Sequence, residues 1–462
     1  MKTNLLFLCA VFSVSTYAEQ PQQYRYIRIP LSEITHQFIQ ESGFIQDHLS
    51  NDTYAIGYLP IKRNFSVTHE VQDKILELDP IQWAHHRFDI KTLNRISEPT
   101  RNPRFPYEDF HTYETLTTEL KTLSSANSLL ASLQSAGKTV QGREMWYLRL
   151  TSKKSGITHK PKLLFISSMH GDEVTGKEMM IYLIRDLLSR YGQEARITNL
   201  LDTAEIFIMP SMNPDGTELS QRFNANGIDL NRNFPKLGED PFGGSHAIET
   251  ENIMELHRQN HFLTALNFHG GELCVNIPWD SKLNNQAAVF GDNSLMLELS
   301  HGYAKTNHPM QANHAANFDH GVTYGYEWYP IYGGMQDWAS NSQQSTHATV
   351  EISTIKWPSA SSLPEFWTDN RESLLGYLEN SLYVIHAKVV NSEGELLESS
   401  VSISTATREL KYNGYVHRPT MHLNQGVTFS SPGYQTKMLE ILPSLFDGSY
   451  VTVTLERNQP LL

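Results

Sequence analysis

Two short stretches of the sequence contain side chains that could bind a metal ion. His170 and Glu173 stand in MHGDE, directly after the apolar run Leu163–Met169, where a helix is expected to begin. Their i, i+3 spacing lets an imidazole and a carboxylate converge on one cation. His269, in LNFHGG, also ends an apolar run, and the glycines after it would let the backbone pass close to a metal. Two His and one Glu leave a fourth coordination position open, which is typical of a catalytic zinc, although other divalent ions would accept the same ligands.

A further carboxylate has the right position to move a proton. Glu351 lies in TVEIS, a short β-branched run, and is expected to project from the end of a strand. A carboxylate beside a metal that is not itself a ligand can act as a general base. The sequence therefore predicts a hydrolytic metal centre rather than a structural one.

The elements around these residues alternate between strands and helices. From about Trp146 to Ile385, apolar runs alternate with segments that have helical periodicity. For example, KEMMIYLIRDLLSRYG separates the runs Leu163–Met169 and Ala204–Met212. This pattern predicts an α/β fold with a mixed β-sheet flanked by helices. Before it, residues 110–133 read as an amphipathic helix region with Thr112 as a possible N-cap.

Two smaller units are expected on either side of this α/β region. Residues 24–89 alternate apolar runs with helix-like stretches and predict a small N-terminal α+β unit. The proline-rich stretch SEPTRNPRFP, residues 97–106, predicts a linker. After residue 383, short β-branched runs with turn signals predict an all-β sandwich. The expected boundaries are 1–18 for a signal peptide, 19–100 for the α+β unit, 107–382 for the catalytic region and 383–457 for the sandwich.

Composition and the first residues limit the class of protein. The chain has 462 residues, 39% of them hydrophobic, as expected of packed domains, and its formal net charge of −13 argues against nucleic acid as a partner. Lys2, the apolar run Leu5–Val14 and small residues up to Ala18 predict a signal peptide cut after Ala18. The run is too short to span a bilayer. We therefore expect a secreted or periplasmic protein without a membrane span.

Six motifs occur in an order that resembles a known family. HGDE, MNPDG, DLNRNFP, FHGG, WYPIYGGMQDW and VEIS followed by KWP appear along the chain as they do in the zinc metallocarboxypeptidases. The residues of these motifs are most similar to those of the regulatory branch that includes carboxypeptidases D, E, M and N. The resemblance covers roughly Tyr107 to Ile385, and it implies a carboxypeptidase-like sheet. The β-rich tail resembles the transthyretin-like domain that follows the catalytic domain in that branch.

The resemblance also implies roles for individual residues. His170, Glu173 and His269 match the ligands of one Zn²⁺ per chain, and Glu351 matches the catalytic glutamate. Arg222 matches the arginine that polarises the scissile carbonyl.

Other matching residues would hold the substrate or support the metal. Asn231 and Arg232 match the pair that binds the terminal carboxylate, a task that suits a guanidinium fork beside an amide. Tyr329 matches the tyrosine that closes over the substrate. Asp229 matches an aspartate that accepts a hydrogen bond from the ring of His170, and a structural turn acid is the alternative.

One residue bears on which C-terminal residue is removed. Asp280 follows His269 by eleven residues, where members of the regulatory branch that prefer terminal Arg or Lys carry an aspartate in the side-chain pocket. A solvated loop aspartate is the alternative reading. Gln336 matches another pocket position, and its neutral amide decides nothing by itself.

The expected function is that of a secreted zinc metallocarboxypeptidase acting on peptide or protein C-termini, with preference for terminal Arg or Lys. An amidohydrolase that uses the same site on cell-wall peptides is the alternative. A binding module without turnover is a third reading, which the presence of all the matched residues argues against. The N-terminal unit is expected to be a pro-domain or accessory domain, with cleavage near Arg101 or Arg104 in the linker.

Overall fold

The computed structural model describes three units of the chain. It describes residues 109–458 except 154–156, 158, 242, 282–289, 315–317, 405, 407–408, 422–424 and 442–448, together with residues 24–34, 38, 42, 44–46, 54–61 and 75–77. The signal peptide predicted for residues 1–18 and the linker predicted for residues 97–106 lie outside the described residues.

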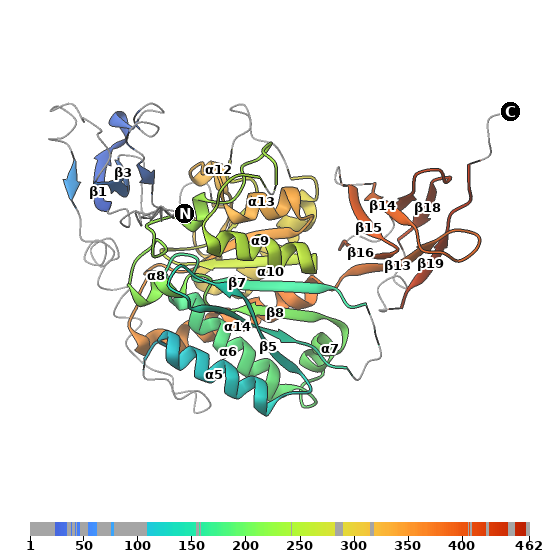
Figure 1. Ribbon diagram of the computed structural model, residues 1–462, viewed down its shortest axis with the longest axis horizontal. Helices are drawn as coiled ribbons and strands as arrows, with labels where there is room; N and C mark the ends of the chain where they lie inside the picture. Colours follow the sequence, from blue (N-terminus) through green and yellow to red (C-terminus); the bar gives the residue numbers. More distant parts are fainter. Residues whose placement is uncertain are drawn as a thin grey trace, which may run out of the picture.

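A mixed eight-stranded sheet forms the centre of the largest unit (Figure 1). Its strand order is β11-β10-β12-β9-β7-β8-β6-β5, in which β12, β9, β7 and β8 are mutually parallel and the pairs β10·β12, β6·β8 and β5·β6 are antiparallel. The strands are β5 Ala131–Lys138, β6 Glu144–Leu150, β7 Lys162–Ser167, β8 Glu205–Met209, β9 Thr264–His269, β10 Glu272–Ile277, β11 Val322–Tyr324 and β12 Thr346–Ser353. The predicted mixed α/β sheet is confirmed.

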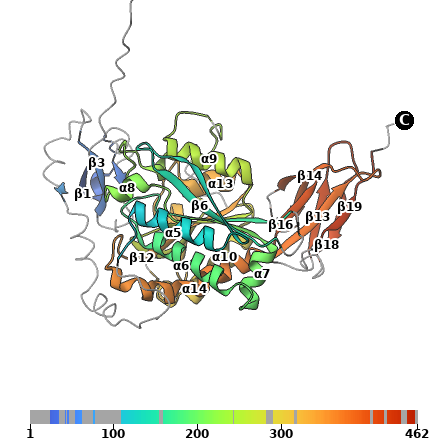
Figure 2. The same ribbon diagram turned by 60° about the horizontal axis from the view of Figure 1, so that its bottom comes forward.

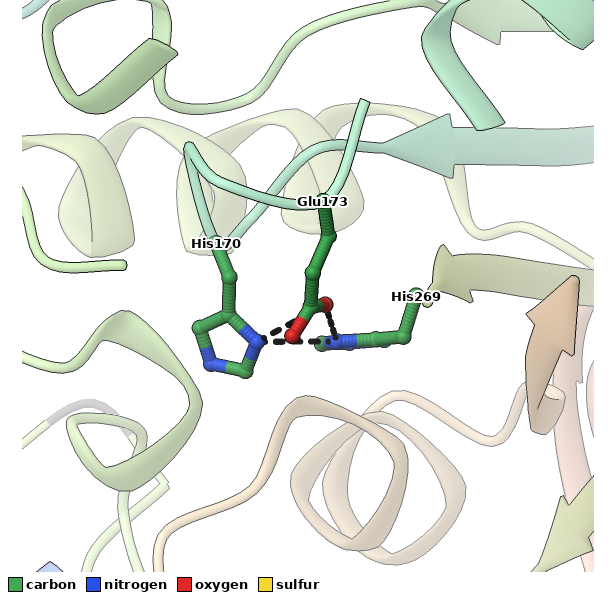
Figure 3. A group of neighbouring side chains, drawn as sticks. All are labelled: His170, Glu173 and His269. Carbon is green, nitrogen blue, oxygen red and sulfur yellow. Dashed lines mark hydrogen bonds and ion pairs between the residues drawn. The ribbon is translucent and has the colours of Figure 1, made fainter. Parts of the chain in front are cut away.

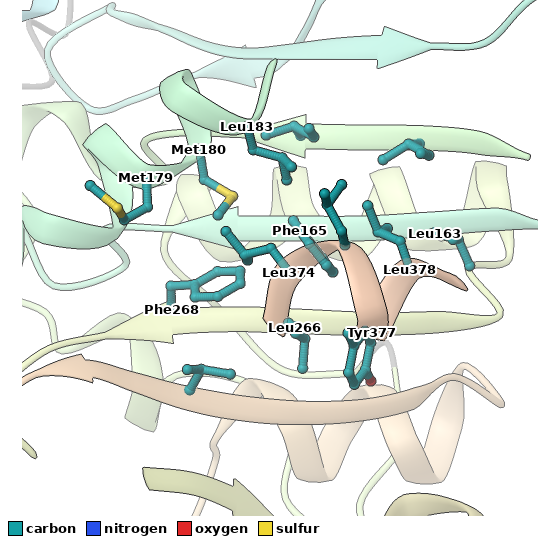
Figure 4. Close-up of a cluster of buried hydrophobic side chains, with 14 of the residues drawn as sticks. Leu163, Phe165, Met179, Met180, Leu183, Leu266, Phe268, Leu374, Tyr377 and Leu378 are labelled. Atoms are coloured by element: carbon teal, nitrogen blue, oxygen red, sulfur yellow. The ribbon is translucent and has the colours of Figure 1, made fainter. Parts of the chain in front are cut away.

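Helices cover both faces of this sheet, and alternation along the strands explains why (Figures 1 and 2). Leu163 and Phe165 of β7 join one buried cluster, whereas Leu164 and Ile166 join the other. The first cluster, part of which Figure 4 shows, lies under α5, α6, α7, α10 and α14, and the second lies under α9 and α13. The helices are α5 Tyr113–Ala126, α6 Thr175–Arg190, α7 Ala195–Thr203, α8 Pro214–Glu218, α9 Ile248–Asn260, α10 Asn293–Thr306, α11 His308–Gln311, α12 Gly325–Trp328, α13 Met335–Ser342 and α14 Leu363–Asn380, with short 3-10 turns η1 Leu31–Glu33, η2 Leu230–Arg232 and η3 Ala360–Ser362.

The helix expected in residues 110–133 is shorter in the structure. Thr112 caps its start, since the Thr112 hydroxyl accepts from the Thr115 amide at 3.3 Å. The helix ends at Ala126, and Asn127 closes it by donating its side-chain amide to the Leu123 carbonyl at 2.9 Å. Residues 127–130 form a turn, because Ser and Asn favour turns over helix interiors, and Ala131 and Leu133 belong to the edge strand β5.

The candidate metal ligands stand at the carboxyl edge of the parallel strands. His170 and Glu173 lie between the end of β7 and the start of α6, and His269 is the last residue of β9. Glu351 on β12 is the register partner of His269. This is the edge where open α/β sheets bind their ligands.

The N-terminal unit is built on a small antiparallel sheet of order β2-β3-β1-β4. Its strands are β1 Tyr24–Pro30, β2 Ile45–Gln46, β3 Tyr54–Pro60 and β4 Leu76–Glu77. One face buries its own apolar cluster, which includes Ile27 and Ile29. On the other face Tyr58 packs against Phe223 of the central unit with ring centroids 5.1 Å apart, and Tyr24 stacks on the same ring at 4.1 Å.

The C-terminal unit consists of two small sheets that share a buried core. The sheets have the orders β16-β13-β19 and β15-β14-β17-β18, and Val389, Val401 and Phe429 are among the residues packed between them. The strands are β13 Val384–Val390, β14 Glu398–Ile403, β15 Glu409–Asn413, β16 Tyr415–Pro419, β17 Gly426–Ser430, β18 Lys437–Glu440 and β19 Val451–Thr454. An all-β tail therefore follows the α/β unit, as expected. Within the described residues no helix combines the length and the hydropathy needed to cross a membrane.

Candidate active site

Three buried side chains converge at the carboxyl edge of β7 and β9 (Figure 3). The Glu173 Oε2 atom lies 3.0 Å from Nδ1 of His170 and 2.8 Å from Nδ1 of His269, and the two Nδ1 atoms are 3.0 Å apart. Among the described residues this is the only group of three or more His, Cys, Asp or Glu side chains whose ligand atoms cluster in this way. Atoms bound to one tetrahedral zinc are roughly 3.3 Å apart, given bond lengths of about 2.0–2.2 Å.

The donor chemistry of this group fits a metal ion. Burial lowers the pKa of His269 to about 4, so its imidazole is neutral at pH 7. Burial also acts to raise the pKa of Glu173, but His170, Lys356 and His269 together hold it well below its ordinary value. A carboxylate oxygen and two ring nitrogens that face one another in a buried space need a positive charge between them. These residues therefore fit a divalent cation.

The loop that carries His170 and Glu173 packs closely against the backbone of a second motif, MNPDG. A Cβ atom at Gly171, inside MHGDE, would collide with the backbone of Gly216 from MNPDG. Glycine at residue 171 thus lets two of the motifs lie against each other. Asn213 ties them further, because its side-chain amide donates to the Met169 carbonyl at 3.2 Å.

Asp229 connects the metal ligands to Arg222. Its Oδ1 atom lies 3.1 Å from Nε2 of His170, and its Oδ2 atom accepts from Nε of Arg222 at 3.0 Å. Burial acts to raise the pKa of Asp229, but Arg222, His170 and Arg232 hold it well below its ordinary value. Burial and Arg222 act to lower the pKa of His170, and Glu173 and Asp229 outweigh them and raise it. A charged Asp229 therefore holds the outer nitrogen of His170 and directs Nδ1 toward the cluster.

Lys356 is a cation beside this cluster that the sequence reasoning missed. Its Nζ atom lies 3.5 Å from Oε1 of Glu173 and 3.5 Å from Oδ2 of Asp172. It comes from the KWP stretch after β12, and that motif was its only signal in the sequence.

The remaining candidate residues line one pocket next to the metal ligands. Glu351 is 5% exposed and faces this pocket from β12. Arg232, beside Asn231 on η2, donates to the Asn231 carbonyl at 3.0 Å, and the Asn231 side chain accepts from the Met335 amide at the start of α13 at 3.0 Å. The pocket is lined by His170, Arg222, Asn231, Arg232, His269, Asn276, Asp280, Trp328, Tyr329, Ile331, Thr349 and Glu351.

Asp280 is a buried member of this pocket and not a solvated loop residue. It is 3% exposed, and its Oδ1 atom accepts from Asn276 at 2.9 Å and from Gln336 at 2.6 Å. Burial and the neighbouring Asp337 raise the pKa of Asp280 well above its ordinary value. Asn276 was not singled out in the sequence, although it precedes Asp280 by only four residues.

Comparison with known families agrees with this geometry. The family described as zinc carboxypeptidase matches residues 116–373, which is more than half of the chain. This chain is a member of the zinc carboxypeptidase family. It is therefore a metallocarboxypeptidase, and zinc is the metal of its family.

Curated relatives of this metallocarboxypeptidase are also carboxypeptidases. Carboxypeptidase M of Mus musculus is 34% identical over 314 residues, covering 63% of this chain and 70% of the relative. Carboxypeptidase SOL1 of Arabidopsis thaliana is 31% identical, covering 75% of this chain and 72% of the relative. Carboxypeptidase D of Drosophila melanogaster is 33% identical over 375 residues, but the match spans only 26% of that longer protein.

Solved structures share the fold of this metallocarboxypeptidase. Carboxypeptidase A from Helicoverpa armigera superposes with a TM-score of 0.55 at 16% identity, covering 78% of this chain and 97% of that chain. Thrombin activatable fibrinolysis inhibitor superposes with a TM-score of 0.54 at 15% identity, covering 78% of this chain and 99% of that chain. At these identities the likeness shows the fold alone.

Proposed function

We propose that this metallocarboxypeptidase removes single C-terminal residues from peptides or proteins outside the cytoplasm and prefers terminal Arg or Lys. The observation that carries this proposal is one pocket lined by both histidines of the buried His-Glu-His cluster, by the buried Asp280 and by two arginines. The arginines suit a substrate with a free carboxylate, and the acid suits a cationic side chain.

Each group in the pocket has a task in this proposal. Arg232 and Asn231 hold the terminal carboxylate, which selects chain ends over internal bonds. Arg222 donates to the carbonyl oxygen as negative charge develops there. Glu351 takes the proton of the attacking water and delivers it to the leaving amine. Zinc, when bound to His170, Glu173 and His269, would act as a Lewis acid on the carbonyl and make the water more acidic.

The preference for Arg or Lys rests on Asp280. Its carboxylate is buried, and it is held by the amides of Asn276 and Gln336, which are neutral. Its pKa is raised because burial and Asp337 outweigh the lowering effects of Asn276, Arg232 and Gln336. A guanidinium or ammonium group of the substrate would add a positive charge directly beside the Asp280 carboxylate, whereas an aromatic side chain would not.

The experiment compares two matched peptides, one ending in Arg and one in Phe, with and without a zinc chelator. We expect chelator-sensitive release of Arg at least about tenfold faster than release of Phe, since one missing charge pair costs more than 1.4 kcal/mol. Asp280→Asn keeps the shape of the side chain and should remove most of that preference. Equal release of both residues by the unaltered protein would overturn the preference, and release from a cell-wall muropeptide alone would favour the amidohydrolase alternative.

We also propose that the N-terminal unit is a pro-domain that shields this pocket. Arg232 donates to the backbone carbonyl of Gln46 at 3.3 Å, and the Arg222 guanidinium lies 5.6 Å from the centre of the Tyr58 ring. The Tyr58 hydroxyl also lies within 3.5 Å of Asp172 and Lys356. These contacts occupy groups that the substrate would need.

The test is to cut the chain in the 97–106 linker, remove the N-terminal unit and repeat the peptide assay. We expect kcat/KM to rise, and Tyr58→Ala in the uncut chain should raise it in part. Full activity of a protein that still begins near Glu19 would contradict the pro-domain proposal.

A further inference from the structure

A second cavity, remote from the metal cluster, lies between the central unit and the C-terminal sandwich. It has a volume of about 1030 Å³ and is lined by residues of both units, among them Arg149, Lys162 and Gln343 on one side and Ser399, Lys411 and Tyr412 on the other. In Figures 1 and 2, β16 is the sandwich strand that lies next to the central unit. The volume is at the upper end of the range for ligand pockets.

The cavity stands at the opposite edge of the sheet from the metal ligands. Lys162 begins β7, and Leu263 directly precedes β9, while His269 ends β9 and His170 follows β7. A strand of six residues spans roughly 20 Å. A ligand in the cavity would therefore leave the catalytic pocket open.

Two buried polar atoms of residues in the cavity wall have no hydrogen-bond partner among the described residues. Gln343 is 7% exposed and its Nε2 atom has no hydrogen-bond partner within the described part of the chain, and the same holds for Oγ of Ser399, which is 4% exposed. They come from different units, one from the end of α13 and one from β14. A buried polar atom without a partner costs about 1–3 kcal/mol, and both atoms belong to residues that line one cavity, so a ligand there that pairs with them would recover this cost.

The wall of the cavity is cationic, although the whole chain is acidic. Four lining residues are Lys or Arg and two are Glu, which leaves an excess of two positive charges in a chain of net charge −13. Glu205 is paired with Arg149 at 2.6 Å, and the ammonium of Lys160 donates to the Thr151 hydroxyl and the Leu201 carbonyl, so Lys162 and Lys411 are the cations that would face a ligand. An anion is the ligand that this charge favours.

Side-chain amides and aromatic rings complete the wall. Gln134, Asn260, Gln344 and Asn413 line the cavity together with Tyr412 and Tyr415. Gln134 and Asn260 use both amide atoms within the protein, and the Gln344 oxygen accepts from the Lys411 amide, which leaves the Gln344 nitrogen and Asn413 to meet a ligand. Amides pair with hydroxyl groups because each carries both a donor and an acceptor, and aromatic rings give apolar surface with a polar tip. This mixture suits a polyhydroxylated ligand better than a lipid or an apolar peptide.

We propose that the cavity between the central unit and the sandwich binds an acidic oligosaccharide, with Gln343 and Ser399 as hydrogen-bonding residues. Binding there would hold the metallocarboxypeptidase on an anionic glycan, and the glycan itself would not cover the catalytic pocket.

The experiment measures binding of labelled hyaluronan and heparin tetrasaccharides to the full chain by fluorescence anisotropy. Neutral chitotetraose and inorganic phosphate serve as unlabelled competitors. We expect at least one acidic tetrasaccharide to bind, more weakly as salt rises from 50 to 200 mM, and neither competitor to displace it at equal concentration. Gln343→Leu and Ser399→Ala should each weaken binding about fivefold, while Lys305→Gln, an exposed charge on α10, should not.

Thermal unfolding separates this role from a structural one. Removing an unsatisfied buried polar atom leaves the melting temperature unchanged or raises it, so a loss of affinity in Gln343→Leu cannot come from unfolding. Failure of both acidic tetrasaccharides to bind, unchanged affinity in both variants, or displacement by chitotetraose or phosphate at equal concentration would overturn the proposal. Binding does not depend on turnover, so this outcome is independent of the proposed peptidase specificity.

Discussion

Glu351 and Asp229 are both buried carboxylates, but their side chains make different contacts in the site. Glu351 lines the catalytic pocket beside His269. Asp229 does not line this pocket, and its two oxygens contact His170 and Arg222. Substituting each one therefore tests a separate part of the site.

Replacing Glu351 by Gln should abolish proton transfer and leave the metal in place. The amide has the same shape but cannot accept the proton, and general acid–base groups contribute typically 10²–10⁴-fold. We expect kcat/KM for a peptide substrate to fall by about that factor. Zinc content, measured after dialysis, should stay at the level of the unaltered protein, and a variant that lost its zinc would show that Glu351 is a ligand instead.

Asp229→Asn should weaken zinc binding rather than prevent it. The substitution removes the negative charge that orients His170 and holds Arg222, and such outer partners are worth about 10–100-fold in metal affinity. Competition with a chromogenic chelator measures this change. An unaltered affinity would assign Asp229 to the turn before η2, where it accepts from the Asn231 amide at 2.9 Å.

At the scale of elements, α9 and α13 carry a buried histidine that makes the fold sensitive to acid. His257 of α9 is fully buried, and its ring packs edge-on to Trp338 of α13 with centroids 5.3 Å apart. Neither ring nitrogen has a hydrogen-bond partner among the described residues. Burial lowers the pKa of His257 to about 3.

This shift predicts a loss of stability as pH falls. The ordinary pKa of His is about 6.5, so between about pH 6.5 and 3 the unfolded chain binds a proton at this residue that the folded chain does not. The free energy of unfolding should then drop by up to about 1.4 kcal/mol per pH unit in this window.

His257→Leu should remove that part of the acid sensitivity. Urea unfolding at pH 7 and pH 5 measures it, with the exposed His308→Gln as the matched control. We expect the stability lost between the two pH values to be smaller in His257→Leu by about 1–2 kcal/mol and unchanged in the control. An equal loss in all three proteins would mean that His257 is already protonated in the folded state at pH 5.

At the scale of the whole molecule, one buried ion pair joins the sandwich to the central unit. Arg418 of β16 is fully buried and donates to both carboxylate oxygens of Asp292, at 2.6 and 3.1 Å, just before α10. Weaker contacts at the rim include the Lys411 amide, which donates to the Gln344 side chain at 2.6 Å. The His159 and Tyr415 rings also stack across the two units, with centroids 3.9 Å apart. The charge pair is thus the buried polar link among several contacts.

Arg418→Met should uncouple the two units. It leaves the buried Asp292 without its guanidinium partner, which costs about 3–5 kcal/mol. We expect scanning calorimetry of Arg418→Met to show two separate unfolding transitions. The added substitution Asp292→Asn should recover most of the lost stability, because it removes the buried negative charge. A single transition at an unchanged temperature in Arg418→Met would show that the other contacts are enough to make the two units unfold together.

Much of the catalytic region follows from local patterns in the sequence. The apolar runs that end at MHGDE and FHGG form neighbouring parallel strands, because periodicity and strand ends are local properties. The helix expected within residues 110–133 is present but ends at Ala126, since residues 131–133 pair with β6 and tertiary pairing overrides local preference.

The convergence of the motifs, in contrast, was decided by the tertiary structure. Local patterns predicted strand ends, but only the sheet order puts β12 beside β9 and so Glu351 beside His269. Asp280 and Gln336 are 56 residues apart in the chain and meet at 2.6 Å only because α13 packs over the sheet. The same is true of Lys356 beside Glu173 and of the cavity under the sandwich. These contacts depend on how buried faces pack across long loops, which no local period encodes, whereas the residue types able to bind a metal, a carboxylate and a proton are already present in the sequence.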